Sequence, residues 1–443
     1  MALDQDAGPL TADHVDSLVA VLDAVRSGRA RTRPELARLL GLGRNVVTQR
    51  VAQLQQAGLV AEGALGPSTG GRAPRKLRFR AEAGWILVAE LGAASIAVAI
   101  CDLHGQVIAV REEPADVTAG PEPVLEQVAA LFDVVLAEQG QQGEPVQVWG
   151  IGVGLPGPVE FATGRPIAPP IMPGWDGYDV RGYLAERFNA PTWVDNDVNV
   201  LALGELRGGL AQGQRDVVYV KIGTGIGAGL VSGGRLHRGA QGCAGDIGHI
   251  AIDDGGDVPC RCGQTGCLEA FAGGAALARD GAGYGADGRS AYLQAVLVSG
   301  RVVSAQDVGL GARHGDPGCV QLLTRSAHLV GESLARIVNF FNPSLILVGG
   351  GVSQSGDLYL AEIRQSVFSR SLPLATRSLQ ILSSPVGEMS GLRGAAFMVI
   401  DELLSRELLG AWISCGTPAD QSLRSTQERA RTGGSSRSIV WPI

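Results

Sequence analysis

Four side chains of the types that bind zinc lie close together between residues 249 and 267. Cys260, Cys262 and Cys267 form a Cys-x-Cys-x₄-Cys pattern, and His249 precedes them in a stretch rich in glycine and carboxylates. Thiolate sulfur and imidazole nitrogen are the ligands of closed, tetrahedral structural zinc sites. The alternative is that the cysteines are small core residues and the histidine an ordinary polar one. The density of the pattern in a chain of seven cysteines favours zinc.

Carboxylates and amides around this pattern need a different ligand. Asp246 and Glu269 flank the zinc candidates, and Asp195-Asn196-Asp197-Val198-Asn199 follows a predicted strand at 192–194 and precedes a predicted helix at 198–206. Such groups at a strand end suit neighbouring sugar hydroxyls, and an aspartate there can accept a hydroxyl proton. The alternative is a helix cap that binds no ligand. One residue of the run can cap the helix while another binds.

A glycine-rich segment at 223–229 lies between two apolar strands. Its glycines allow backbone N–H groups to approach an anion, and one threonine adds a hydroxyl. The candidate phosphate-binding residues are Gly223, Thr224, Gly225 and Gly227. A simple tight turn explains the same glycines, and the local sequence favours neither interpretation.

The elements that carry these groups follow a segment with a very different charge. Between Arg26 and Arg80 there are twelve basic and two acidic residues, a local charge of +10, so the rest of this −7 chain carries −17. A basic segment on an acidic body is typical of polyanion binding, although a solvated basic face gives the same count.

The local pattern favours DNA. Apolar residues recur at helical spacing in 15–25, 32–42 and 44–60, with a tight turn before the third segment. This is the helix-turn-helix arrangement, in which the last helix enters the major groove. We expect its polar side chains to contact bases and phosphates, namely Arg44, Asn45, Thr48, Gln49 and Arg50.

Residues 66–80 alternate glycine turns with arginines before a short predicted strand. Arg72, Arg75 and Lys76 lie in this segment, and we expect them to follow the minor groove or backbone as a basic wing. A mere linker has no need of this charge. The alternative is a helical module that binds proteins only.

From residue 84 the pattern changes to alternating strands and helices. Three strands are expected in 85–113, a helix in 124–139 and a strand in 146–159; two more strands are expected in 216–239 and one in 344–353. Two β-rich α/β halves, each with a glycine-rich hairpin near its start, predict a duplicated fold that closes over a cleft.

Length and composition complete these expectations. A chain of 443 residues exceeds the size of a single core, and we expect a DNA-binding domain over 1–80, a two-lobed body over 81–410 and a disordered tail over 411–443. No apolar run reaches the length of a membrane span. The remaining cysteines show no disulfide framework, which suits the reducing cytoplasm.

Together these motifs resemble the ROK family, named for repressors, open reading frames and sugar kinases. The resemblance covers roughly residues 15–405, and its most specific part is Gly248-His249 followed by Cys260-Arg261-Cys262-Gly263-Gln264-Thr265-Gly266-Cys267-Leu268-Glu269. It implies an α/β fold with an N-terminal winged helix-turn-helix and an actin-like, duplicated ribonuclease-H-like body of two lobes.

The resemblance also implies roles for single residues. His249, Cys260, Cys262 and Cys267 would bind structural zinc, and the sugar contacts would be Asn196, Asp197, Asp246, His249 and Glu269. Asp197 is at the position of the catalytic base in the kinases of the family. His249 has two implied roles, of which we favour zinc. Asp246 replaces the family's glutamate and is one methylene shorter.

The chain departs from the family's kinases at the first strand pair. Where they carry an Asp-x-Gly-x-Thr phosphate loop, this chain has Glu90-Leu91-Gly92-Ala93-Ala94-Ser95. A longer carboxylate and an added Cβ are poorly matched to octahedral Mg²⁺ and a close phosphate. We therefore do not expect ATP and Mg²⁺ as cofactors.

The resemblance to the repressor branch implies a homodimer or higher homo-oligomer that binds a DNA operator and responds to a monosaccharide or sugar derivative. An ATP-dependent sugar kinase with a DNA-binding head is the alternative. A constitutive DNA-binding protein with a vestigial sugar pocket is a third hypothesis.

Overall fold

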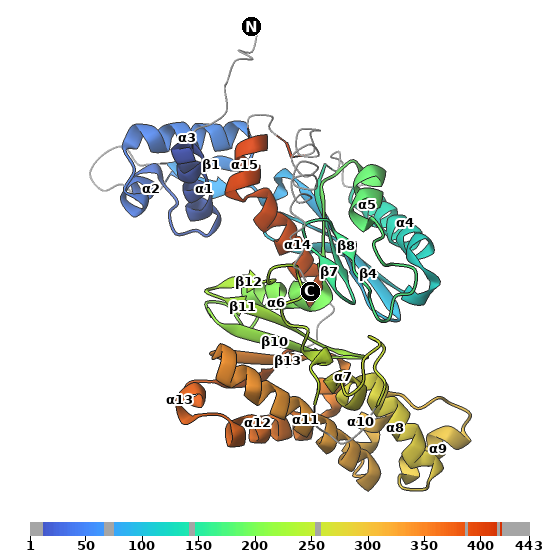
Figure 1. Ribbon diagram of the computed structural model, residues 1–443. Helices are drawn as coiled ribbons and strands as arrows, with labels where there is room; N and C mark the ends of the chain where they lie inside the picture. The colour runs from blue at the N-terminus through green and yellow to red at the C-terminus, as the bar shows by residue number, and fades with distance from the viewer. Residues whose placement is uncertain are drawn as a thin grey trace, which may run out of the picture.

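The computed structural model describes residues 12–65, 75–140, 147–252, 258–385, 389–413 and 417–418. Helices and strands form a small N-terminal head beside two larger lobes (Figure 1). Short 3-10 helices occur in the connections: η1 (Ala81–Ala83), η2 (Val117–Ala119), η3 (Ile247–His249) and η4 (Gly351–Ser355). In the described parts of the chain, we find no helix whose length and apolar character would let it cross a membrane.

The head contains three helices and a two-stranded hairpin: α1 (Ala12–Arg26), α2 (Arg33–Leu40), α3 (Arg44–Gln56), β1 (Val60–Leu65) and β2 (Arg75–Phe79). Thr32 caps α2, because its Oγ1 accepts a hydrogen bond from the Glu35 backbone N–H at 3.3 Å. Gly41 ends the helix in the left-handed conformation, with φ of 64°. Three helices followed by a two-stranded hairpin are the elements, in the order, that the predicted winged helix-turn-helix requires.

The third helix is shorter than predicted. It ends at Gln56, and Gly58, with φ of 74°, turns the chain into β1. Val60, placed in the helix by its apolar spacing, instead pairs with Phe79 in the antiparallel hairpin. Periodicity alone does not separate a buried helix end from a buried strand start.

The first lobe is built on a five-stranded sheet of order β5-β4-β3-β6-β9. Its strands are β3 (Trp85–Leu91), β4 (Ser95–Cys101), β5 (Val107–Pro114), β6 (Val148–Leu155) and β9 (Thr192–Asn196). A small hairpin joins β7 (Val159–Glu160) to β8 (Arg165–Pro166). The helices α4 (Pro121–Gly140) and α5 (Val180–Phe188) lie together on the outer side of the lobe (Figure 1).

The second lobe repeats this sheet. Its order is β12-β11-β10-β13-β14, with strands β10 (Val217–Ile222), β11 (Ile226–Ser232), β12 (Arg235–His237), β13 (Leu345–Gly349) and β14 (Gln380–Ser383). In both lobes three antiparallel strands are followed by two parallel ones. The predicted duplication is confirmed, and β12 is one strand more than the sequence predicted there.

Seven helices of the second lobe are described: α7 (Leu268–Ala272), α8 (Gly274–Ala286), α9 (Ala291–Val298), α10 (Ala305–Arg313), α11 (Pro317–Phe341), α12 (Asp357–Arg370) and α13 (Pro373–Thr376). Strand residues alternate between two cores. Val218 and Val220 of β10 belong to the core formed with these helices, whereas Val217 and Tyr219 face the core shared with the rest of the molecule.

Two helices at the lobe junction complete that shared core, α6 (Asp197–Gly208) and α14 (Met389–Leu403). They cross at glycines. A Cβ on Gly394 would lie 1.9 Å from the Val200 carbonyl oxygen, and one on Gly204 would lie 2.2 Å from that of Ser390. The two backbones are therefore in contact, and α6 and α14 pack as one unit.

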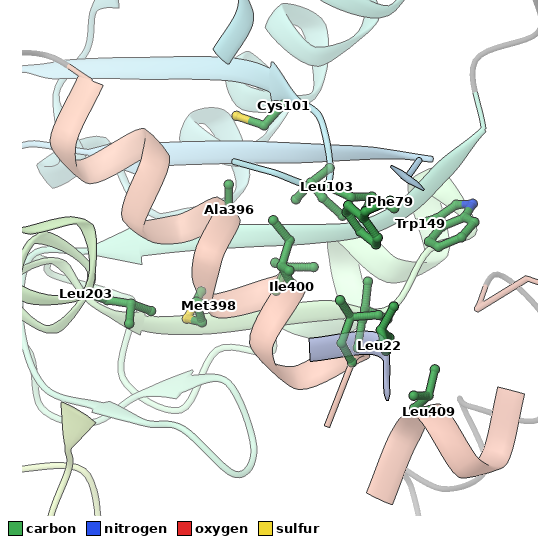
Figure 2. Close-up of a cluster of buried hydrophobic side chains, with 14 of the residues drawn as sticks. Leu22, Phe79, Cys101, Leu103, Trp149, Leu203, Ala396, Met398, Ile400 and Leu409 are labelled. Atoms are coloured by element: carbon green, nitrogen blue, oxygen red, sulfur yellow. The ribbon is translucent and has the colours of Figure 1, made fainter. Parts of the chain in front are cut away.

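The same core reaches the head through α15 (Arg406–Trp412). Figure 2 shows Leu22 of α1, Phe79 of the wing, Ile400 of α14 and Leu409 of α15 gathered in it. Trp412 is fully buried, and its ring lies 5.4 Å from that of Trp149. The predicted disordered tail is therefore wrong at its start, because burial of Trp412 keeps residues 411–413 in the fold. Residues 414–416 and 419–443 lie outside the described residues.

Candidate functional site

A cleft of about 1030 Å³ is lined by residues of both lobes. All the predicted sugar contacts line it, namely Asn196, Asp197, Asp246, His249 and Glu269. The predicted phosphate-loop residues Gly223, Thr224, Gly225 and Gly227 line it as well. Folding thus brings together four sequence segments that span more than 70 residues of chain.

Asn196 is the N-cap of α6. Its Oδ1 accepts the Val198 backbone N–H at 2.9 Å, and its Nδ2 donates to the Gly157 carbonyl at 2.6 Å. Both ends of the amide therefore have a protein partner, and the capping alternative holds for this residue. Asp197 follows it, 6% exposed, with its carboxylate at the cleft.

Asp195, which precedes Asn196, binds side chains of both lobes. It is 1% exposed, and its carboxylate accepts hydrogen bonds from Arg238 Nε at 2.7 Å and from Asn199 Nδ2 at 2.8 Å. Arg238 follows β12 of the second lobe and stacks on Phe161 of the first lobe, 3.7 Å from the ring centroid. These contacts join the two lobes beside the cleft.

Sequence reasoning missed Lys221. This residue lies on β10, lines the cleft, and its Nζ donates to Asp197 Oδ2 at 2.6 Å. Burial opposes the charged form, but the carboxylates of Asp197 and Glu90 raise the pKa of Lys221 above its usual value. A signal existed in the sequence, because Lys221 interrupts the apolar strand VVYVKI and is one of only two lysines in the chain.

The glycine-rich segment forms the tight turn between β10 and β11. It packs against the start of α8 in the same lobe. The backbone N–H groups of Gly274 and Ala275, at the start of α8, donate to the carbonyls of Gly223 and Thr224 at 2.8 and 3.0 Å. Glu269 Oε2 accepts the Ile226 N–H at 2.9 Å. One oxygen of this carboxylate therefore anchors the loop.

The first strand pair turns at Gly92, whose N–H donates to the Ser95 carbonyl at 2.8 Å. Ala93, Ala94 and Ser95 line the cleft. The Glu90 carboxylate packs instead against Gly391 at the start of α14, where an added Cβ would lie 1.8 Å from Glu90 Oε2. Burial raises the pKa of Glu90 against the opposing charge of Lys221.

The predicted metal ligands converge. One ligand atom from each of His249, Cys260, Cys262 and Cys267 lies within 4.8 Å of all the others. Isolated bridges between Ala251 and Cys267 and between Pro259 and Thr265 fold the loop around them. Three sulfurs and one nitrogen at this spacing can hold a metal ion of tetrahedral preference.

The imidazole of His249 lies between this cluster and the cleft. Its Nδ1 is 3.5 Å from Cys260 Sγ, and its Nε2 is 3.8 Å from Asp246 Oδ1. The two nitrogens face different partners, Nδ1 the cysteine cluster and Nε2 the Asp246 carboxylate at the cleft. Burial raises the pKa of Asp246, and His249 opposes that shift.

The predicted DNA-contacting side chains of α3 are mostly on the surface. Arg44, Asn45, Thr48 and Gln49 are exposed. Arg50 is a correction: it is buried, and its Nε donates to Ser17 Oγ of α1 at 2.7 Å. Helical spacing places residue 50 on the stripe that faces α1, and tertiary packing uses its long side chain there.

The wing carries part of the predicted basic surface. Arg75 and Lys76 of β2 are exposed, and Arg75 Nε lies 3.5 Å from Glu62 Oε2 across the hairpin. Arg72 lies outside the described residues.

A chain of ionic contacts connects the cleft helices with the head. Asp401 of α14 accepts from Arg207 Nε of α6 at 3.1 Å and lies 3.9 Å from Arg26 of α1. Arg406 of α15 pairs with Asp16 of α1 at 2.9 Å. The helix that begins at Asp197 in the cleft thus ends beside the head.

Comparisons with a family model and with known proteins indicate the same family. The model of the ROK family matches residues 87–402. The xylose repressor of Caldicellulosiruptor bescii is 30% identical over 391 residues, which cover 87% of this chain and 95% of that protein. A glucokinase of Halalkalibacterium halodurans is also 30% identical, over 73% of this chain and 97% of its own.

Among solved structures, a ROK family transcriptional regulator, described as a homologue of the Escherichia coli MLC protein, matches with a TM-score of 0.78. The match covers 93% of this chain and all of that one at 24% identity. At 24% identity, this match shows that the two chains share a fold.

Proposed function

The chain belongs to the ROK family, and from this membership we propose that it is a sugar-responsive transcriptional repressor. The supporting observation is the combination of an exposed α3 surface on a winged head with a polar cleft whose catalytic-position carboxylate is already engaged. Asp197 is paired with Lys221 at 2.6 Å, and Glu90 is directed at Gly391.

The sugar is proposed to act by closing the two lobes. A ligand shifts a conformational equilibrium only if it binds one arrangement more tightly than the other. Hydroxyl-binding groups at the start of α6 and in the 245–269 loop belong to different lobes, so a sugar that contacts both favours one lobe arrangement. Asp401 then relays a movement of α6 and α14 to Arg26 of the head.

The metal in this proposal is structural zinc, held by His249, Cys260, Cys262 and Cys267. Zinc supplies no chemistry to the sugar here. It would fix the chain segment that carries Asp246 and His249 at the cleft and hold the imidazole, whose Nδ1 lies 3.5 Å from Cys260 Sγ.

The proposed partners are a palindromic DNA operator, a monosaccharide or sugar derivative, and a second copy of the chain. A symmetric dimer presents two α3 helices to two half-sites one helical turn apart. The proposed location is the cytoplasm, where reduced cysteines can serve as metal ligands.

Gel-shift titrations test the proposal directly. Zinc-loaded, full-length protein is titrated against the DNA upstream of its own gene, with and without each common hexose, pentose and disaccharide. We expect retention that weakens with salt and changes with one sugar. Absence of retention under all conditions would contradict DNA regulation, and retention that no sugar changes would favour constitutive binding.

An active sugar kinase is the second candidate, favoured by the glucokinase relative and by retention of Asp197. ADP release measured across the same sugars distinguishes it. Sugar-dependent turnover that disappears in Asp197→Asn would establish the kinase and overturn our choice.

A further inference from the structure

Lys221 places an ammonium group between two carboxylates at the junction of the lobes. Nζ lies 2.6 Å from Asp197 Oδ2, on the first residue of α6. Glu90, at the end of β3, forms a second attractive interaction with this ammonium. Lys221 comes from β10, so one cation of the second lobe faces carboxylates at the end of β3 and at the start of α6.

This is the neighbourhood in which kinases of the family would need a divalent cation. Mg²⁺ in phosphoryl transfer is held by one or two carboxylates together with phosphate oxygens. Here the residues do not fit that ion. Glu90 packs on Gly391, and the remaining carboxylate is occupied by a side chain of positive charge that would repel a metal ion.

We propose that Lys221 is the resident cation of the cleft: it replaces the divalent ion, holds Asp197 in an ion pair, and excludes metal-dependent phosphoryl transfer while leaving the sugar pocket intact. Asp197 and Lys221 then offer a sugar an acceptor and a donor side by side. Neighbouring hydroxyls can use both, without a metal.

The residue type supports this assignment. The chain has 37 basic residues, of which only Lys76 and Lys221 are lysines. The planar fork of an arginine is bulky, whereas an ammonium is a compact point charge. The raised pKa keeps Lys221 charged throughout the physiological range, as a permanent substitute for a metal ion requires.

The inference deepens the proposed function, because it explains how a sugar site of kinase ancestry can serve as a sensor. Only the statement that the site serves as a sensor rests on the proposed function; the replacement of a metal ion by Lys221 does not. Its test measures metal binding and does not involve DNA, so a failed gel shift and a failed metal experiment are separate results.

Mn²⁺ is the probe, followed by its paramagnetic resonance spectrum in zinc-loaded, full-length protein. We expect the wild-type chain to leave Mn²⁺ free in solution. Lys221→Met removes the charge with little loss of length, and the Asp197 carboxylate, left without its cation, then binds Mn²⁺ at least about tenfold more tightly than wild type does. Lys221→Arg keeps a positive charge in a bulkier group and is expected to leave Mn²⁺ free, as wild type does, because the charge repels the metal ion.

Two results would overturn the proposal. One is Mn²⁺ binding by the wild-type chain that is lost in Asp197→Asn, which would mean that the metal site coexists with Lys221. The other is a folded Lys221→Met chain, checked by circular dichroism, that binds no more Mn²⁺ than wild type. If that variant does not fold, Lys221→Gln provides the same neutral substitution with a polar end and is judged by the same two criteria.

Discussion

Arg238 Nε donates to Asp195 Oδ2 at 2.7 Å and joins the second lobe to the first by an ion pair whose acidic partner is 1% exposed. The guanidinium also covers the Phe161 ring of the first lobe. The contact lies beside the cleft, because Asp195 directly precedes the cleft-lining Asn196.

Arg238→Met is expected to lower the free energy of unfolding by about 3 kcal/mol, because it leaves a buried carboxylate without its cation. Urea denaturation followed by circular dichroism measures the change. Arg235→Met is the matched control, since Arg235 is exposed on the adjacent strand and should change stability by less than about 0.5 kcal/mol. Equal effects of both substitutions would show that the interlobe pair does not stabilise the fold.

Cys262→Ser is expected to remove most of the bound zinc, because a tetrahedral site loses one of its four ligands. Metal content after gel filtration measures it, with one zinc per chain expected in wild type. Cys243→Ser is the control for metal content alone, because Cys243 is exposed and outside the cluster but lines the cleft. Sugar affinity should fall with loss of the metal, because the proposed zinc fixes the chain segment that carries Asp246 and His249. Full sugar response in a zinc-free chain would contradict the proposed role of the metal.

One substitution on α3 and one on the wing should affect DNA binding in different ways. Asn45→Ala on α3 is expected to weaken operator binding about 10- to 100-fold and to relax sequence preference, as loss of a base contact does. Lys76→Ala on the wing should weaken binding to all sequences and reduce the salt dependence by about one counterion. Fluorescence anisotropy over a salt series measures both. Arg111→Ala, on β5 of the first lobe, should change neither quantity.

Asp401→Asn is expected to reduce the effect of sugar on DNA affinity while each ligand still binds alone. The carboxylate contacts both Arg207 of α6 and Arg26 of α1, so its loss weakens the link between cleft and head. The measured quantity is the ratio of operator affinities with and without sugar. Asp133→Asn removes a comparable surface pair with Arg187 and is expected to leave that ratio unchanged. If both variants keep the wild-type ratio, coupling does not pass through Asp401.

Local patterns determined much of the fold and site. The Cys-x-Cys-x₄-Cys spacing predicted a cluster that the structure brings within 4.8 Å, since ligands so close in sequence need only a short loop to meet. Thr32 and Gly41 set the ends of α2 through cap geometry that depends on neighbouring residues. Alternating strand and helix patterns likewise predicted the two related lobes.

Contacts between distant segments were decided only by the tertiary structure. Arg50 lies in the segment whose sequence predicts DNA contacts, yet packing against α1 buries its side chain. Lys221 and Asp197 are 24 positions apart, and Asp195 and Arg238 are 43 apart. No local pattern specifies such pairs, because the meeting of two charges across a lobe junction depends on the three-dimensional path of the chain. The sequence alone determined which chemical groups are present, and the tertiary structure decided that a lysine pairs with Asp197, the carboxylate at the base position of the family's kinases.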